Sequence, residues 1–366
     1  MLTSPLDDVH RGAHMTEFAG WSLPLRFGSE LAEHTAVRQT AGLFDLSHMA
    51  QLEIRGPAAG QALDFALTGA HGAMPHGRAS YSLMLEPDGG IVDDLIVYRL
   101  ADAEYLVIAN AANRQAVLER LTERLAQHEA TVRDSTLERT LIAVQGPRSA
   151  EILAAAGLRE VATGLRYYTA APAQLDGVDV LVARTGYTGE DGFEISAPAG
   201  EASGIWAKLE QAGEPFGLVR AGLAARDTLR LEAAMPLYGH ELTLNTTPWD
   251  AGLNRFVDLT KPDFVGKSAL VSDDGTPHPR QRRLIGLAGS GRRAARAGYQ
   301  VLTAADGEAI GEVTSGALSP TLGHPIALAY IDPGVESAPG TPLAVDIRGT
   351  HQRFTVAARP FYRRAT

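Results

Sequence analysis

Two adjacent carboxylates, Asp93 and Asp94, stand at the head of an apolar segment, GGIVDDLIVYRL, at residues 89–100. The apolar run predicts a strand that enters a core, and the two glycines before it predict a turn. Because successive side chains of a strand point to opposite faces, the two aspartates should point apart. A given pocket should therefore receive only one of them, as a group for proton transfer or for electrostatic stabilisation of a charge.

A further carboxylate, Glu194, lies at the end of a glycine-rich segment, RTGYTGEDGFEI, at residues 184–195. Gly186, Gly189 and Gly192 predict a sharp turn or a close approach of backbone to a ligand. A carboxylate that follows such a turn can accept two parallel hydrogen bonds from a ring with paired N–H donors. The alternative interpretation is an exposed strand residue after a hairpin.

The segment GLAARDTLRLEAAMPLYG, at residues 222–239, predicts a helix followed by a stop. Arg226 and Arg230 share one face of this helix. In the functional interpretation, one of them is a fixed guanidinium for a substrate carboxylate. In the alternative interpretation, the helix surface carries salt bridges to Asp227 and Glu232.

Metal and nucleotide motifs are missing. The eleven histidines show neither an HExxH nor another metal-ligand spacing, and the chain has no P-loop and no G-x-S-x-G segment. GSGRRA at 289–294 imitates a dinucleotide fingerprint, but the next strand, starting at Gly298, leaves no room for a crossover helix. His48, between Ser47 and Met49, is interpreted as a hydrogen-bonded structural histidine. We therefore expect no metal.

The elements that must position these residues alternate between helix and strand up to residue 270. Apolar spacing predicts helices at 114–128 and 204–213. Apolar runs that end in glycine predict strands at 139–146 and 179–186. Two strand–helix combinations of this kind indicate two α+β subdomains.

A different pattern follows residue 271. Residues 272–281 are polar with two prolines, which predicts a linker. Beyond it come short apolar segments at even spacing, separated by glycine and proline turns. This pattern predicts a small β-barrel or sandwich.

Composition limits the classes of protein. The length of 366 residues indicates two or three domains, and the 45% apolar content is enough for globular cores. The absence of cysteine excludes disulfides, thiolate metal sites and a cysteine nucleophile, which fits a reducing compartment. We find neither a signal peptide nor an apolar run that could cross a membrane, and expect a soluble, cytoplasmic protein.

Charge is unevenly distributed. The net charge of −10 argues against nucleic acid as the main ligand. Residues 279–296 nevertheless contain a run of arginines without an acid: Arg280, Arg282, Arg283, Arg292, Arg293 and Arg296. Either these arginines receive an anionic partner near the mouth of a cleft, or they form a solvated loop face.

Several of these segments, in this order along the chain, resemble the T protein of the glycine cleavage system, an aminomethyltransferase family. The matching segments are FAGW, GLFDLSHM, GGIVDDLIVY, RTGYTGEDGFEI, AARDTLRLEAAMPLYG, DFVGK and VTSGALSPTLGHPIALAY. The resemblance covers essentially the whole chain. It implies an α+β fold with three domains in a cloverleaf, in which two mixed α/β subdomains within 1–271 precede a β-barrel at 282–366.

The resemblance also implies roles for individual residues. Asp94 falls on the catalytic aspartate of the family, which leaves Asp93 for a structural hydrogen bond. The positions expected to bind folate are Glu194, Arg226, Tyr98, Asn110 and Tyr187. The family often supplies one more ligand contact from its C-terminal tail, and here Arg363 and Arg364 are both candidates.

The reaction implied by the resemblance uses tetrahydrofolate as co-substrate and the lipoylated H protein as partner. An aminomethyl group on the dihydrolipoyl arm of H protein gives up its carbon to tetrahydrofolate, which yields 5,10-methylenetetrahydrofolate and ammonia. The thiol belongs to the carrier, so a chain without cysteine can catalyse this transfer. Loss of ammonia develops positive charge on carbon, which a nearby carboxylate stabilises.

Two other functions fit the same pocket. One is a folate-dependent demethylase that acts on a free small substrate. The other is a folate-binding protein without transferase activity. Retention of both Asp94 and Arg226 disfavours the second alternative.

Overall fold

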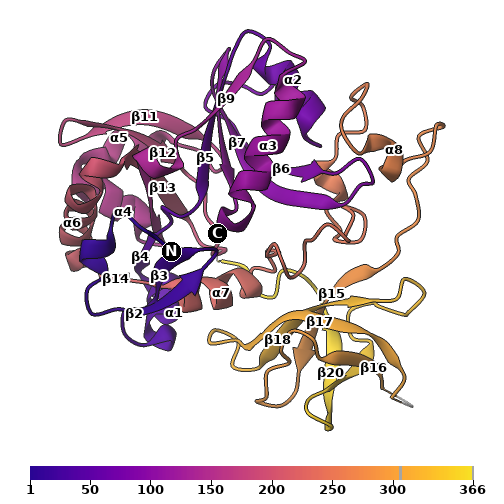
Figure 1. Ribbon diagram of the computed structural model, residues 1–366. Helices are drawn as coiled ribbons and strands as arrows, with labels where there is room; N and C mark the ends of the chain where they lie inside the picture. The colour runs from indigo at the N-terminus through magenta and orange to yellow at the C-terminus, as the bar shows by residue number, and fades with distance from the viewer. Residues whose placement is uncertain (305–306, 365–366) are drawn as a thin grey trace.

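The computed structural model describes residues 1–304 and 307–364, which form three lobes around a common centre (Figure 1). The first lobe contains a six-stranded sheet, the second a five-stranded sheet, and the third a closed barrel. Two mixed α/β lobes followed by a barrel confirm the α+β fold class predicted from the sequence. Residues 365 and 366, the end of the expected domain at 282–366, lie outside the described residues.

The six-stranded sheet of the first lobe has the order β11-β12-β13-β10-β4-β14. Its strands are β4 (Ala41–Asp45), β10 (Arg139–Gln145), β11 (Ala170–Leu175), β12 (Val178–Ala183), β13 (Gly192–Pro198) and β14 (Leu218–Arg220). The helices of this lobe are α1 (Glu30–Gln39), α4 (Ser149–Leu153), α5 (Arg159–Gly164), α6 (Ala202–Gly213) and α7 (Leu223–Glu232). A small sheet lies beside them, built from β1 (Leu2–Thr3), β2 (His14–Phe18) and β3 (Trp21–Arg26).

The second lobe is inserted between β4 and β10 of the first, so the two lobes are interleaved along the chain. Its sheet has the order β6-β7-β8-β5-β9. The strands are β5 (Ala50–Arg55), β6 (Ala79–Leu85), β7 (Ile91–Ala101), β8 (Glu104–Ala109) and β9 (Thr131–Asp134), and the helices are α2 (Ala59–Ala66) and α3 (Arg114–Leu125). Apolar side chains such as Leu63, Val97 and Leu121 form a core between the sheet and these helices.

The two sheets share a second core, which is formed by their other faces. Phe44 and Leu141 of the first sheet pack here with Tyr98 and Ile108 of the second. Leu229 of α7 joins the same cluster. Each sheet is therefore buried on both faces in this region, and residues near the ends of its strands can reach a space between the lobes.

The third lobe is a barrel with the strand order β15-β18-β17-β16-β19-β20, which decides between the barrel and sandwich alternatives. Its strands are β15 (Arg283–Gly289), β16 (Gln300–Thr303), β17 (Ala309–Leu318), β18 (Pro325–Ile331), β19 (Pro342–Asp346) and β20 (His351–Ala357). Alternate apolar side chains, among them Leu287, Val313 and Phe354, fill its interior. The short helix α8 (Lys267–Leu270) precedes the linker.

Most local elements lie where the sequence predicts them. The predicted helices at 114–128 and 204–213 are α3 and α6, and the strand at 139–146 is β10. Residues 272–281, the predicted linker, form a largely exposed segment without helix or strand. Residues 290–299 contain no helix, so no crossover helix follows GSGRRA, as predicted. Among the described residues, we find no helix with the length and apolar character to cross a membrane.

One strand prediction is wrong at its end. β12 stops at Ala183, whereas the sequence predicts a strand that continues to Gly186. The carbonyl of Thr185 accepts a hydrogen bond from Nε2 of Gln145 at 3.0 Å, and a Cβ on Gly186 would lie 1.9 Å from Oε1 of Gln145. The chain leaves the sheet here in order to pass over this buried side chain.

Candidate active site

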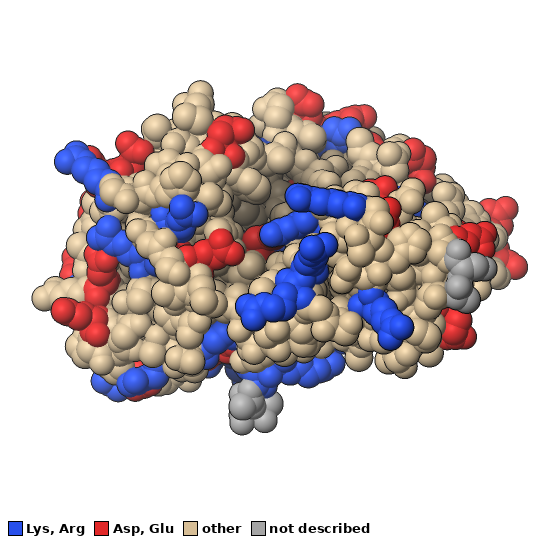
Figure 2. All heavy atoms as spheres, turned by 90° about the horizontal axis from the view of Figure 1, so that it is seen from below, with Lys and Arg blue, Asp and Glu red and all other residues tan. Residues whose placement is uncertain are grey.

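A cavity of about 2170 Å³ lies where the three lobes meet. Figure 2 shows a hollow near the middle of one face of the molecule, with Lys and Arg side chains gathered beside it. The cavity is lined from the second sheet, the first sheet, α7 and the barrel. The lining includes Tyr81, Asp94 and Asn110, then Tyr187, Glu194 and Arg226, and finally Arg280, Arg283, Arg292 and Arg296.

Asp94 lines the cavity from β7. Its carboxylate accepts hydrogen bonds from the hydroxyl of Tyr81 at 3.0 Å and from Nδ2 of Asn110 at 2.8 Å. Burial raises the pKa of Asp94 to about 6, although both of these hydrogen bonds act to lower it. Asp94 is therefore mainly ionised at neutral pH, but its pKa lies close to that pH.

Asp93 points away from the cavity, as strand alternation predicts. It is fully buried and accepts hydrogen bonds from Nδ2 of Asn113 at 2.7 Å and from both the backbone N–H and Nδ2 of Asn110. Burial and the neighbouring Asp94 raise the pKa of Asp93 well above its usual value. The expected structural hydrogen bonds of Asp93 are therefore present.

Asn110 links the two aspartates. It follows the end of β8, which is paired with β7, and its amide donates to Oδ1 of Asp93 and Oδ1 of Asp94, each at 2.8 Å. Asn110 also lines the cavity. Its position makes it a residue that orients Asp94 as well as a candidate for contact with a ligand.

Glu194 lines the cavity from β13, which runs between β10 and β12. The hydroxyl of Thr185 donates to Oε2 of Glu194, and the hydroxyls of Thr185 and Tyr98 lie 3.1 Å apart. Because Thr185 gives its only hydrogen to Glu194, Tyr98 donates to Thr185. Oε1 of Glu194 accepts no hydrogen bond from the residues that the structure describes, which leaves it free for a ligand.

Tyr98 itself does not line the cavity. Its side chain is 2% exposed and lies in the core between the two sheets. Alternation in β7 places it on the same face as Asp94, four residues earlier. Its hydroxyl lies 3.1 Å from that of Thr185, and burial together with the nearby carboxylate of Glu194 raises the pKa of Tyr98 well above its usual value. The structure therefore places Tyr98 behind Glu194 rather than on the cavity wall.

The sequence predicts that the backbone of the glycine-rich segment turns sharply or approaches a ligand closely. In the structure, this backbone approaches a buried side chain of the protein itself. A Cβ on Gly192 would lie 2.3 Å from Nε2 of Gln145, so both this glycine and Gly186 pack against one buried glutamine. Gly189 has a φ of +81°, which confirms the sharp turn. The glycines thus shape the segment that carries Glu194, and Gly186 also lines the cavity.

Arg226 lies on α7 and faces the cavity. Its guanidinium lies 4.8 Å from the ring centroid of Tyr187, which also lines the cavity and donates its hydroxyl to the carbonyl of Pro236. Nη1 of Arg226 is buried without a hydrogen-bond partner among the described residues. A free buried donor of this kind fits a group that meets a ligand.

The salt-bridge alternative holds for Arg230 instead. Arg230 is 2% exposed and bonds to Asp227 at 2.8 Å and to Glu241 at 3.0 Å. Glu232 was expected to pair on this helix, but it bonds to Arg38 of α1 at 2.7 Å. Both arginines line the cavity, but the guanidinium of Arg230 is occupied by its ion pairs, whereas Nη1 of Arg226 has no partner among the described residues.

The interpretation of His48 as a hydrogen-bonded histidine is wrong. His48 is 2% exposed, lines the cavity and makes no hydrogen bond to the described residues. It contacts the ring of Phe18 edge-on, with the ring centroids 5.8 Å apart. Asp45, three residues before His48, does not act as its hydrogen-bond acceptor. Its carboxylate accepts hydrogen bonds from Ser4 and Ser47 instead.

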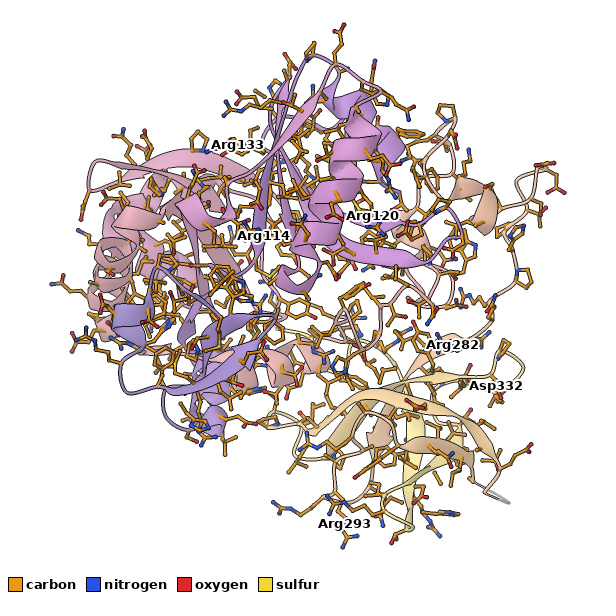
Figure 3. All side chains as sticks on the ribbon, in the orientation of Figure 1. Arg114, Arg120, Arg133, Arg282, Arg293 and Asp332 are labelled. Carbon is orange, nitrogen blue, oxygen red and sulfur yellow. The ribbon has the colours of Figure 1, made fainter. Side chains whose placement is uncertain are left out.

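The run of arginines does not form one patch. Arg280, Arg283, Arg292 and Arg296 line the cavity. Arg282 instead lies over the ring of Tyr330, 4.7 Å from its centroid, and Figure 3 shows Arg282 and Arg293 at opposite ends of the barrel. The barrel closes between them, so neighbours in sequence separate in space.

The C-terminal tail returns from the barrel to the centre of the molecule (Figure 1). Nη1 of Arg364 lies 3.5 Å from Oδ1 of Asp191, and its guanidinium lies 5.8 Å from the ring centroid of Tyr167, a cavity residue. Arg363 is exposed. Of the two candidates, Arg364 is the one held beside the cavity.

Tyr81 and Thr185 are the site residues that sequence reasoning missed. Tyr81 reaches Asp94 because β6 pairs with β7 in a register that sets Leu83 opposite Asp94. The position of Tyr81 within the segment ASYSLML was the available signal, but the segment does not show which strand it pairs with. No group of three or more His, Asp or Glu side chains that could hold a metal occurs within the described parts of the chain.

Comparisons with known proteins bear on the whole chain. Residues 7–261 match the model of the GCVT N-terminal domain, and residues 282–363 match the glycine cleavage T-protein C-terminal barrel domain. The chain belongs to the glycine cleavage T-protein family. The family and the enzyme class predicted from the sequence, a tetrahydrofolate-dependent aminomethyltransferase, are thereby confirmed.

Relatives resemble the chain over nearly their full length. An aminomethyltransferase of Streptomyces coelicolor is 55% identical over 98% of this chain and 97% of its own. An aminomethyltransferase of Cutibacterium acnes is 51% identical over 99% of this chain and 98% of its own. The crystal structure of the glycine cleavage system aminomethyltransferase T from Bartonella henselae superimposes with a TM-score of 0.90 at 37% identity, covering 99% of this chain and 98% of that one.

Proposed function

We propose that this enzyme takes the one-carbon unit from an aminomethyl group on the dihydrolipoyl arm of H protein and transfers it to tetrahydrofolate. The products are 5,10-methylenetetrahydrofolate, ammonia and the dihydrolipoyl carrier. The observation that supports this most directly is the meeting of Asp94 and Glu194, from two different sheets, on one cavity of about 2170 Å³. A cavity of this size has room for a folate together with the end of a carrier arm.

Glu194 supports binding of the pterin ring in this proposal. The ring presents an amine and a ring N–H side by side, and the free Oε1 together with Oε2 can accept from both. Thr185 fixes the rotation of the carboxylate, and Tyr98 fixes Thr185. We therefore assign Tyr98 a positioning role and keep Asn110, Tyr187 and Arg226 as direct contacts of the folate.

Asp94 is the proposed catalytic carboxylate. When the C–N bond of the aminomethyl group breaks, the electron pair leaves with ammonia and positive charge develops on the carbon. An ionised Asp94 stabilises that charge until one folate nitrogen attacks the carbon. The second folate nitrogen then displaces the sulfur of the carrier as a thiolate, and the two protons lost from the folate nitrogens go to this thiolate and to the released ammonia. With a pKa raised to about 6, Asp94 is ionised at pH 7 and can still relay a proton.

The carrier protein is the proposed partner, and the cavity arginines of the barrel are its proposed docking surface. They lie at a cavity in a chain whose net charge is −10, which gives an acidic partner a local positive field. Cytoplasmic location, which the sequence predicts, remains part of the same proposal.

The test is turnover with a lipoylated H protein loaded with the aminomethyl group. We expect ammonia and 5,10-methylenetetrahydrofolate to form in equal amounts when enzyme, carrier and tetrahydrofolate are all present. Turnover of a free N-methylated amine in place of the carrier would favour the demethylase alternative. Folate binding without turnover of either substrate would favour a binding protein.

A further inference from the structure

His48 is a buried polar side chain that the proposed mechanism does not use. It is 2% exposed, and neither ring nitrogen makes a hydrogen bond to a described residue, with Nδ1 fully enclosed. Burying an imidazole without a partner costs stability, since its hydrogen bonds to water are lost and not replaced. Unsatisfied groups of this kind are rare in folded proteins and call for an explanation.

The nearby carboxylate does not supply a partner. Asp45 accepts hydrogen bonds from the hydroxyl of Ser4 and from the backbone N–H of Ser47 at 2.8 Å, and Nε2 of His10 lies 3.2 Å from its Oδ2. These hydrogen bonds lower the pKa of Asp45, although burial alone would raise it. His48 is thus left beside an ionised group that already has its donors.

Arg226 has the same deficiency at the same cavity. Its Nη1 is buried and lacks a partner among the described residues, and both Arg226 and His48 line the cavity. Burial and the charge of Arg226 lower the pKa of His48 to about 4, against the effect of Asp45. At pH 7 the imidazole is therefore neutral, with one N–H to donate.

We propose that His48 and Arg226 together bind the carbonyl oxygen of the pterin ring, so that His48 is a further folate-binding residue. The inference rests on the proposed function. The pterin carbonyl adjoins the ring N–H that we assign to Glu194, so a ligand held by Glu194 turns an acceptor toward the neighbouring donors. Glu194 and Arg226 both line the cavity, and the charge of Glu194 raises the pKa of Arg226 against the effect of burial.

The chain contains a matched control. His71 is also fully buried, and its Nδ1 also lacks a partner, but its Nε2 lies 3.1 Å from the hydroxyl of Ser82. It does not line the cavity. A substitution at His71 therefore reports the effect of removing a buried imidazole that has no part in binding.

The experiment compares His48→Phe with His71→Phe by two measurements on the full chain. Calorimetric titration gives the affinity for tetrahydrofolate and for 6-methyltetrahydropterin, which lacks the benzoylglutamate. Thermal unfolding without ligand gives stability. We expect His48→Phe to weaken both ligands by roughly three- to tenfold, the loss of one hydrogen bond. Its melting temperature should stay equal or rise, because an unpaired polar group is replaced by an apolar ring of similar shape.

His71→Phe should behave in the opposite way, with lower stability and unchanged affinity. Equal affinity of the wild type and His48→Phe would overturn the proposal, and so would a loss for tetrahydrofolate alone, because the contact would then not be to the pterin. If His48→Phe does not fold, His48→Leu is measured in the same way. Failure of both to fold would make His48 a structural residue and overturn the proposal, whereas a wild type that binds neither ligand would overturn the proposed function itself.

Discussion

At the scale of single residues, Asp94 and Glu194 are prepared in different ways. Asp94 is buried, and its pKa is raised to about 6, so its charge depends on pH close to neutrality. Glu194 has one oxygen held by Thr185 and the other free, so its geometry is set before a ligand arrives. The first arrangement fits a group that interacts with a changing charge, and the second fits a group that recognises a fixed pair of donors.

Substitution by asparagine should have different effects at the two aspartates: on turnover at Asp94 and on stability at Asp93. We expect Asp94→Asn to lower turnover of the loaded carrier by about 10²–10³, since one preorganised electrostatic group is lost. Folate affinity, measured by calorimetry, should survive. Asp93→Asn serves as the control, with activity mostly retained and a lower melting temperature. Equal losses of turnover in the two variants would contradict the assignment.

The pH dependence of turnover should carry the signature of Asp94. The carboxylate is the active form, so turnover in the wild type should fall as pH decreases through about 6 and should be level above it. This acidic limb should be absent from the residual activity of Asp94→Asn. A limb that persists unchanged in the variant would belong to another group.

Glu194 should govern folate affinity without governing the fold. We expect Glu194→Gln to weaken tetrahydrofolate at least about tenfold, because a charge-assisted pair of hydrogen bonds contributes ~1.5–3 kcal/mol. Calorimetric titration measures the affinity, and the melting temperature of the free protein is the control. Normal binding by the variant would mean that the pterin lies elsewhere in the cavity.

At the scale of elements, α7 connects the cavity to the barrel. Arg226 turns to the cavity, while Glu232 at the other end of the helix is fully buried against other elements. Oε2 of Glu232 accepts from Arg38 of α1 at 2.7 Å and from the hydroxyl of Thr321 at 2.8 Å. Ser319 also donates to Glu232. One carboxylate thus joins α7, α1 and the barrel segment that follows β17.

Loss of that carboxylate should destabilise the whole protein. We expect Glu232→Gln to lower the free energy of unfolding by about 2–3 kcal/mol, because Arg38 loses one of its two buried carboxylate partners and keeps only Glu190, at 2.9 Å. Denaturant unfolding measures the change. Glu151→Gln is the control, since the Glu151–Arg148 pair is exposed and such pairs contribute little. Similar effects in both variants would show that burial of the Glu232 cluster is unimportant.

At the scale of the whole molecule, positive charge is concentrated at the cavity although the protein is acidic overall. The chain has a net charge of −10, yet the barrel contributes arginines to the wall of the cavity. Arg292 lies on that wall and Arg293 does not, although they are neighbours in sequence. The closed barrel therefore produces a local positive surface that the overall charge conceals.

This surface should control association with the carrier. We expect Arg292→Glu combined with Arg296→Glu to slow association about tenfold at low salt and to flatten its salt dependence. Folate affinity should not change, because Glu194 and Arg226 hold the ligand in the proposed arrangement. Arg293→Glu is the matched control, with stopped-flow association as the measurement. Equal effects from Arg293→Glu would indicate a general effect of charge.

Features that depend on periodicity within one element were accessible from the sequence. Alternation along β7 separates Asp94 from Asp93, and apolar spacing locates α3 and α6 to within a few residues. Regular short apolar segments place β-structure after residue 281. In each case the side-chain direction follows from the repeat of a strand or a helix, which requires no knowledge of the rest of the chain.

Features that depend on the pairing of distant segments were decided only by the tertiary structure. Tyr81 reaches Asp94 through the register of two strands, and Thr185 holds Glu194 across a turn shaped by Gln145. His48 lacks a partner among the described residues, whereas the carboxylate of Asp45 is held by Ser4 and lies 3.2 Å from His10, both more than thirty residues away in sequence. Which donor meets which acceptor depends on how elements pack, and local sequence patterns carry no information about that choice.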